Sequence, residues 1–271
     1  MRALVSPGER SRSVEPATAV AGDLRAPETL GEAVRGASAV VSACELERED
    51  RSAGLTWAAI LADGQRNLAE AARAEGVRRL VLVGSLAAEP EAHSGELRMR
   101  AAGEQAARSS GVECVVLAAG MLFGPGTMLE RMLGRWASGR WPVTLVPGQG
   151  SAEIQPISAG DVALAALRAV GGQIPAGRHE LAGEARYALM DLIDLALAAA
   201  RRSPLRLHVP SAVLSAAGPL LDRLPRGALP DSRELKLLRG RWTSSARASA
   251  LVGRKPEGVA EWISAAFGRK P

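Results

Sequence analysis

Short apolar runs alternate with longer helical stretches in the first half of the chain, and this alternation restricts the fold most strongly. The runs are Met1–Val5, Thr18–Ala21, Ser38–Ala43, Arg79–Gly84 and Glu113–Leu117. Three of the intervening segments carry apolar residues at three- and four-residue spacing, which is typical of helices: Pro27–Arg35, Leu55–Glu75 and Leu97–Ser109. Strands without polar alternation, separated by helices, predict a parallel sheet that is covered on both faces and joined by right-handed crossovers.

The pattern changes after Gly120, where loop signals become frequent. Gly-Pro clusters at 124–126 and 147–150 flank a predicted helix over 127–138. Ser158 or Asp161 is expected to cap a helix that runs to Ala169, and we interpret Asp161 as a cap rather than a catalytic acid. A strand is predicted over 178–181, a helix over 190–200, and short amphipathic helices from Pro204 onward. We therefore expect a core domain over residues 1–125 and a smaller C-terminal lobe over 126–271 that returns elements to the core.

Composition limits the class of protein. With 271 residues, 47% of them apolar, the chain can bury a full core. The sequence shows neither an apolar run of about 18 residues nor a signal-peptide pattern, so we predict no membrane span and a cytoplasmic location. Cys44 and Cys114 each lie in an apolar run, which favours buried reduced thiols over a disulfide. His93, His179 and His208 show no metal-ligand spacing, and no metal site is predicted.

The charge distribution does not favour nucleic-acid binding. The formal charge is +5 and the pI is near 10.0, but the arginines are spread along the chain and do not interleave with aromatic residues. A dispersed basic surface supports only weak, salt-sensitive binding to nucleic acid. We expect a small-molecule substrate or a nucleotide as the ligand, and a protein partner is left open.

Several motifs, in order, resemble one known superfamily. They are Ala21–Leu24 after a strand, Val40–Ala43 at the end of the next, Gly64–Ala72 on a long helix, Val77–Ser85, Gly120–Gly126 and Gln155–Ala163. Together they are similar to extended and atypical short-chain dehydrogenases/reductases, including NmrA-like proteins and the Rossmann-type accessory subunit of respiratory complex I. The resemblance covers the chain to about Ala200. It implies a doubly wound, Rossmann-like α/β fold and an NAD or NADP cofactor.

The start of the chain departs from this superfamily. Members of the superfamily begin with a strand and a Gly-x-x-Gly-x-x-Gly turn, which holds the cofactor pyrophosphate at a helix N-terminus. Arg2–Val5 corresponds to their second strand, so the first strand is missing between Met1–Val5 and Ser38–Ala43. We expect that the functional polypeptide extends upstream of Met1, or that another chain supplies this strand. Cofactor binding by the chain as given is expected to be weak or absent.

The catalytic motif is also altered. The Tyr-x-x-x-Lys pattern of the superfamily corresponds here to Glu96 and Arg100. Glu96 is a poor general acid unless it is strongly desolvated, and Arg100 can hydrogen-bond a ribose but does not change protonation state usefully. Ser85 stands where the superfamily has a catalytic or substrate-contacting serine. Two interpretations of Ser85 stay open: a strand-end hydroxyl that binds polar groups, and a catalytic residue.

The resemblance implies a set of cofactor contacts: Asp23, Leu24, Ala43, Ser85, Arg100, Gly120 and Met121. Asp23 is interpreted either as a contact to the adenine or as a carboxylate in a turn after the strand. Ser6, with Arg10 and Arg12 nearby, occupies the position that distinguishes NAD from NADP, and this choice stays open. The run Glu45–Arg51 is interpreted as a solvated loop, and Trp136 and Trp141 as lining a substrate pocket or packing in the core.

These observations predict an NAD(P)-binding oxidoreductase-family protein, NAD-dependent epimerase/dehydratase-like, without the usual tyrosine-lysine chemistry. One alternative is a non-catalytic regulator or assembly protein that uses the cofactor cleft. Another is an isomerase or ligand carrier that acts through a pocket near Ser85 and Met121.

Overall fold

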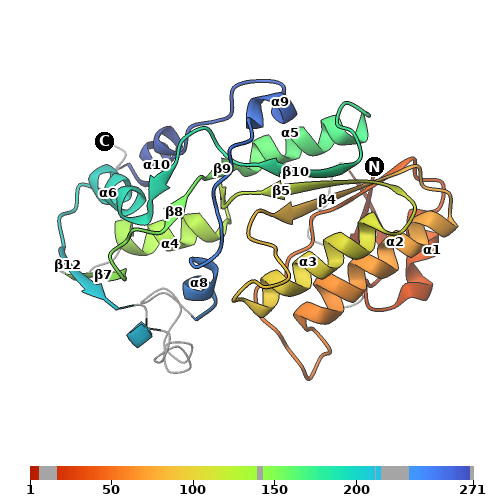
Figure 1. Cartoon of the computed structure of the whole chain (residues 1–271), viewed down its shortest axis with the longest axis horizontal. Coiled ribbons are helices and arrows are strands. Elements are labelled where there is room, and N and C mark those ends of the chain that lie inside the picture. The colour runs from red at the N-terminus through yellow and green to blue at the C-terminus, as the bar shows by residue number, and fades with distance from the viewer. Residues whose placement is uncertain (6–16, 139–142, 211, 215–231, 269–271) are drawn as a thin grey trace. The chain divides into compact units, whose positions relative to one another are not determined.

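A computed structural model describes residues 1–5, 17–138, 143–210, 212–214 and 232–268 (Figure 1). These residues form two compact units. Unit 1 comprises Met1–Gly84, Ala88–Leu117 and Ala166–His179, and unit 2 comprises Ser85–Ala87, Ala118–Ala165 and Glu180–Pro271. The predicted α/β class with parallel strands is confirmed. The boundary predicted at residue 125 stays a prediction, and the two units interleave along the chain.

Most residues of a four-stranded sheet lie in unit 1. Its order is β10-β5-β4-β3, with β3 at Ala39–Ser42, β4 at Arg79–Ser85, β5 at Glu113–Ala119 and β10 at Gly177–Leu181. β3 runs parallel to β4, with Val40 opposite Leu80. The side chains of Leu80 and Val81 are fully buried, because β4 has a strand on each side and is covered on both faces.

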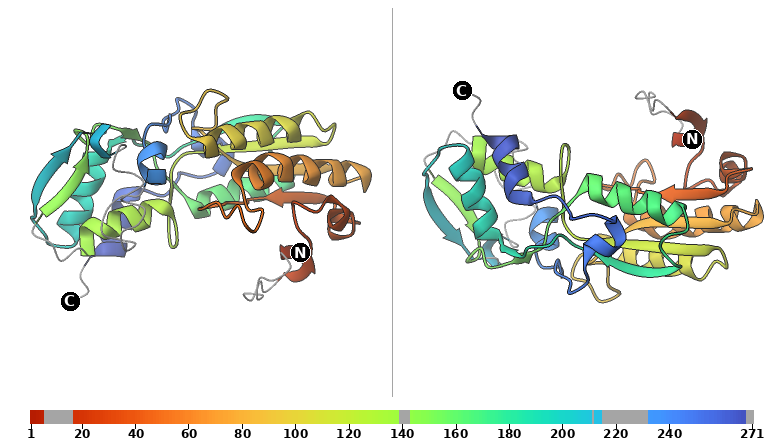
Figure 2. Two further views of the ribbon diagram at one scale, coloured as in Figure 1. Left: turned by 90° about the horizontal axis from the view of Figure 1, so that it is seen from below. Right: turned by 90° about the horizontal axis from the view of Figure 1, so that it is seen from above.

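Helices of unit 1 cover the two faces of this sheet. α2 (Gly64–Ala74) and α3 (Gly95–Arg108) lie on one face, and residues 166–170 of α5 (Ala159–Val170) lie on the other (Figure 2). α1 (Leu30–Val34), which follows the short 3₁₀ turn η1 (Pro27–Thr29), packs on α2. Leu30, Leu68, Leu80 and Val116 belong to one buried cluster that joins these helices to the strands.

Cys114 on β5 is part of the same cluster, and burial raises the pKa of its thiol to about 11. Cys44 is half-buried, and both thiols are free. No helix in the described part of the chain is both long enough and apolar enough to cross a bilayer.

The first two strands form a ladder of their own. β1 (Arg2–Val5) runs parallel to β2 (Thr18–Ala21), and the carbonyls of Met1 and Val5 accept hydrogen bonds from the amides of Thr18 and Gly22. Among the described strands, none pairs with the other edge of β1, and none joins β1 to β3. Leu4 is 41% exposed and Val41 on β3 is 49% exposed, in contrast to the buried residues of β4. The two ladders are therefore separate, with an apolar side chain exposed on each.

Unit 2 packs short strands against helices. Its helices are α4 (Met128–Ser138), α6 (Leu189–Ala199), α8 (Ser232–Leu237), α9 (Ala248–Val252) and α10 (Val259–Phe267), together with the first part of α5. Its strand pairs are β6 (Leu122–Phe123) with β9 (Ile157–Ser158), β8 (Glu153–Ile154) with β11 (Tyr187–Ala188), and β7 (Val143–Pro147) with β12 (Leu205–Val209). α6 packs against both α4 and α10. The ring centroids of Phe123 on β6 and Trp262 on α10 are 5.4 Å apart.

The prediction of short helices alone after Pro204 is wrong at Leu205–Val209. These residues form β12, which pairs in parallel with β7, another strand that the sequence analysis missed. Leu205, Leu207 and Val209 alternate with Arg206 and His208, which is the period of a strand rather than of a helix. Trp136 packs in the core of unit 2, and its indole N–H donates to the Leu145 carbonyl of β7 at 3.2 Å.

Asp161 lies in the first turn of α5 and is fully buried. Its carboxylate accepts a hydrogen bond from the amide of Glu257 at 2.7 Å and lies 2.7 Å from the Arg254 guanidinium. The Ser158 hydroxyl donates to the Glu257 carboxylate and accepts from the amide of Gly160. The start of α5 therefore holds the segment that leads into α10.

The separate ladders lead to a prediction for amide hydrogen exchange. We expect the amides of β1 and β3 to exchange faster than those of β4, because among the described strands each of these two pairs on one side only and carries an exposed apolar residue. Native-state exchange followed by mass spectrometry or NMR at constant pH measures the difference. Equal protection of β1, β3 and β4 would show that these edges are covered in solution.

Candidate functional site

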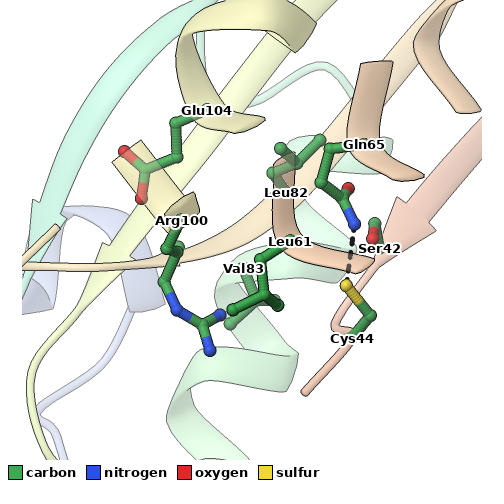
Figure 3. Close-up of a pocket in the computed structure, with 9 residues that line it drawn as sticks. Ser42, Cys44, Leu61, Gln65, Leu82, Val83, Arg100 and Glu104 are labelled. Carbon is green, nitrogen blue, oxygen red and sulfur yellow. Dashed lines mark hydrogen bonds between the residues drawn. The ribbon is translucent and has the colours of Figure 1, made fainter. Parts of the chain in front are cut away.

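A small pocket lies where β3 and β4 end and where two helices approach them (Figure 3). All of its lining residues belong to unit 1: Ser42, Cys44, Leu61, Gln65, Leu82, Val83, Gly84, Arg100 and Glu104. The carboxyl ends of strands are the edge at which open parallel sheets bind ligands. The pocket therefore occupies the expected place for a ligand site on this sheet.

Two glycines allow α3 to approach the pocket closely. A Cβ at Gly103 would overlap the carbonyl of Leu61, and a Cβ at Gly84 would overlap the Glu104 carboxylate. Leu61 lies in η2 (Ala58–Asp63), a π-helical turn that leads directly into α2. π-Helical turns are frequent at functional sites. The close approach places Arg100 and Glu104, one turn apart on α3, beside the ends of the strands.

Arg100 carries the positive charge of the pocket. Its Nη2 lies 2.9 Å from the Glu45 carboxylate and 3.7 Å from that of Glu96, and its side chain is 12% exposed. Glu45 belongs to the run Glu45–Arg51, which the sequence analysis interpreted as a solvated loop. Part of this loop is anchored, because Glu45 pairs with Arg100 and the Glu49 carboxylate accepts from the amide of Trp57.

Glu104 lines the same pocket and is almost fully buried. Its carboxylate accepts a hydrogen bond from Arg178 Nε at 3.0 Å. Arg178 lies at the start of β10, which is the edge strand opposite to β3 in the four-stranded sheet. The ion pair thus joins α3 to β10 and balances the negative charge of Glu104.

Cys44 and Gln65 form the opposite wall of the pocket. Gln65 Nε2 donates to Cys44 Sγ at 2.7 Å, as Figure 3 shows. Burial raises the pKa of the Cys44 thiol, although the nearby Arg100 lowers it, so the sulfur keeps its proton at neutral pH. This wall is polar but uncharged.

Four of the residues predicted to contact the cofactor lie in unit 1: Asp23, Leu24, Ala43 and Arg100. Arg100 lines the pocket, and Ala43 is exposed directly after β3. The carbonyl of Leu24 accepts a hydrogen bond from Asn67 of α2 at 2.8 Å. The Asp23 carboxylate is held by Arg25, whose Nε lies 3.0 and 3.1 Å from its two oxygens, and Arg25 also donates to the Ala53 carbonyl.

The other three predicted contacts lie in unit 2: Ser85, Gly120 and Met121. The Ser85 hydroxyl accepts from the amide of Ala87 at 3.2 Å. The amide of Gly120 donates to the Leu181 carbonyl, and Met121 is buried. Ser6, Arg10, Arg12 and Trp141 lie outside the described residues.

Sequence reasoning missed Gln65, Cys44 and Glu104 as pocket residues. A signal for Gln65 was present, because Gln65, Leu68 and Ala72 repeat at the spacing of one helix face, and that face is buried. A polar residue at an inward position of an apolar stripe is unusual. Glu104 follows Arg100 by four residues and therefore shares its face of α3. Within the described ranges, no group of three or more His, Cys, Asp or Glu side chains could hold a metal ion.

Comparison with known proteins finds one matching family model and several similar proteins. Residues 1–133 match the family model described as NAD(P)H-binding. Subunit 9 of the NADH dehydrogenase [ubiquinone] 1 alpha subcomplex of mouse mitochondria is 26% identical over 206 residues, which cover 75% of this chain and 53% of that protein. A ceramide reductase of Caulobacter vibrioides is 34% identical over 107 residues, 40% of this chain and 33% of that protein. The chain thus spans about half of the first relative and a third of the second.

Solved structures with the same fold include an NADPH-dependent quinone oxidoreductase of Escherichia coli, solved with NADPH. It has a TM-score of 0.72 and 20% identity, with 93% of this chain and 84% of that chain covered. A nucleoside-diphosphate-sugar epimerase of Staphylococcus aureus has a TM-score of 0.71 and 19% identity, with 96% of this chain and 89% of that chain covered. The predicted Rossmann-like fold is therefore confirmed.

The Asp23–Arg25 pair leads to a prediction for acid stability. Its hydrogen bonds from Arg25 hold the pKa of the Asp23 carboxyl below its ordinary value, so the pair stabilises the fold at neutral pH. Since the Arg25 side chain is 33% exposed, we expect Asp23→Asn to lower the free energy of unfolding by only about 0.5–1 kcal/mol at pH 7. This difference should disappear as the pH falls through the range in which the folded-state carboxyl becomes protonated. Urea unfolding at several pH values measures it.

The matched control for this prediction is Asp63→Asn, which removes a more exposed ion pair with Arg66. We expect little change in its unfolding free energy at any pH. If Asp23→Asn lowered the free energy of unfolding by the same amount at acidic pH, the ion pair would not be the origin of the effect.

Proposed function

We propose that this chain, whose residues 1–133 match the family model described as NAD(P)H-binding, is a protein of the oxidoreductase class that binds NAD(H) or NADP(H) at the carboxyl ends of the unit 1 strands. The observation that supports this most strongly is the pocket at the ends of β3 and β4, which lies within the matched region. Ligands of open parallel sheets bind at this edge. The quinone oxidoreductase and the ceramide reductase among the similar proteins are consistent with an oxidoreductase function.

Arg100 is the proposed contact to the dinucleotide in this pocket. Its guanidinium is mostly buried, whereas the Glu45 carboxylate that it faces is half-exposed. A ligand could displace this carboxylate from Arg100. A ribose hydroxyl would accept a hydrogen bond from Arg100 in place of Glu45. Asp23, Leu24 and Ala43 in unit 1, and Ser85, Gly120 and Met121 in unit 2, remain proposed contacts.

The chemistry of α3 distinguishes this chain from tyrosine-dependent reductases. Glu96 and Arg100 occupy the positions of the acid and its lysine, and their side chains lie 3.7 Å apart. The chain has a single tyrosine, Tyr187, which lies on β11 of unit 2 rather than on α3. We therefore propose that no tyrosine of α3 delivers a proton to a reduced carbonyl.

A binding titration tests the proposed function. We expect NADH or NADPH to bind with a dissociation constant weaker than about 1 μM, and Arg100→Ala to weaken the binding at least about tenfold, since a hydrogen bond to a charged group contributes roughly 1.5–3 kcal/mol. Calorimetry at high protein concentration measures both constants, with the melting temperature as a check on folding. Arg98→Ala is the matched control, because Arg98 lies on the same helix, is exposed and donates to the Ala92 carbonyl. The absence of any binding by the unmodified chain would refute the proposal.

A second experiment tests whether the chain lacks a general acid for carbonyl reduction. We expect the reduction of ketones by NADPH to stay at background, because loss of a general acid lowers the rate by about 10²-fold or more. The decrease in nicotinamide absorbance over a panel of ketones and quinones gives the measurement. Robust turnover by the unmodified chain would show that another group supplies the proton.

A further inference from the structure

Gln65 presents a buried hydrogen-bond acceptor without a partner. Its side chain is 5% exposed, and its Nε2 donates to the Cys44 sulfur. Its Oε1 has no hydrogen-bond partner among the described residues. A buried carbonyl oxygen left unsatisfied is costly and rare in folded proteins. Such an atom in the wall of a pocket therefore indicates that a donor is supplied from outside the chain.

The size of the pocket limits what this donor is. The cavity volume is about 20 Å³, which is room for one oxygen or nitrogen atom with its hydrogens and no more. A ring or a phosphate group does not fit. The donor is therefore a single hydroxyl or amine that projects from a larger ligand, or a water molecule.

The charged groups that surround the cavity are already engaged. Arg100 faces Glu45 and Glu96, and Glu104 accepts from Arg178. An anionic group would meet the Glu104 carboxylate, and a cationic group would meet Arg100. A neutral donor avoids both repulsions, and the neutral acceptor Gln65 Oε1 suits it.

From these observations we infer that the Gln65 pocket binds one ribose hydroxyl of the dinucleotide, with the hydroxyl donating to Gln65 Oε1. The inference rests on the proposed function, since it takes the ligand to be a nicotinamide dinucleotide. It adds a specificity residue on α2 that the sequence comparison did not indicate. The ribose hydroxyls of such a ligand are neutral donors of one-atom size.

The test uses Gln65→Met, which keeps the length of the side chain and removes the amide. In the full chain we expect the affinity for NADPH or NADH to fall about tenfold, because one ligand hydrogen bond is lost. In the absence of ligand we expect the melting temperature to change little, because the substitution removes both the unsatisfied oxygen and the Nε2 hydrogen bond to Cys44. Gln105→Met on α3 is the matched control, since Gln105 is exposed and donates to Ser109, and it should change neither quantity.

Dinucleotide analogues that each lack one ribose hydroxyl identify the group. For one of them, the unmodified chain and Gln65→Met should bind equally well, because the hydrogen bond is absent in both. If Gln65→Met binds NADPH and NADH as tightly as the unmodified chain, the inference is wrong while the proposed function stands. If the unmodified chain binds neither dinucleotide, the proposed function fails, and this inference fails with it.

Discussion

The close contact between α3 and the π-helical turn before α2 is the constraint on which the pocket depends. A side chain at Gly103 would collide with the backbone at Leu61, so the two segments meet at this distance only because the residue is glycine. Arg100 and Glu104 lie on either side of Gly103, and the contact presses both against the ends of β3 and β4. Interiors of this density do not absorb an added methyl group without movement. The electrostatics of the pocket thus follow from a packing requirement.

Each of the two charged residues of the pocket pairs with a residue at an edge of the four-stranded sheet. Glu104 is balanced by Arg178 from β10, and Arg100 is balanced by Glu45 from the loop after β3. The two arginines come from different elements, and each ion pair joins α3 to a different edge of the four-stranded sheet. Because buried charges are stable only when they are paired, α3 is fixed in position at two points. The uncharged wall formed by Cys44 and Gln65 has no such constraint, and it is the wall that retains an unsatisfied atom.

Much of the fold could be predicted from the sequence, because its strongest signals are local. Runs such as Arg79–Gly84 are apolar enough to specify a buried strand by themselves, and the helix spacing of 97–109 is regular. β7 and β12 were missed because each is short and half-exposed, and because they pair across a long sequence separation that a local pattern does not encode. The amphipathic alternation at 205–209 was the available signal.

The candidate site was predicted only in part, for a physical reason. Arg100 could be identified from its place in a motif, but the roles of Glu45 and Glu104 depend on ion pairs with partners 55 and 74 residues away. Asp23 was assigned from its position after a strand, whereas the structure shows that its carboxylate is committed to Arg25. The long-range pairs of Glu45 and Glu104 leave no trace in residue spacing, whereas Asp23 and Arg25 are only two residues apart, and their spacing was a local signal that was not used.

The buried Asp161 has a consequence for how unit 2 unfolds. Its carboxylate is held by a backbone amide and a guanidinium that both come from the segment 254–257, about a hundred residues further along the chain. Detachment of α10 together with this segment would leave a negative charge inside the protein without a counter-charge. Partial opening at the C-terminal end is therefore penalised, and α5 and α10 should lose their structure together as one cooperative unit. For protein engineering, this means that a fusion after residue 268 leaves the contact intact, while a deletion that begins before Arg254 removes the counter-ion of a core residue.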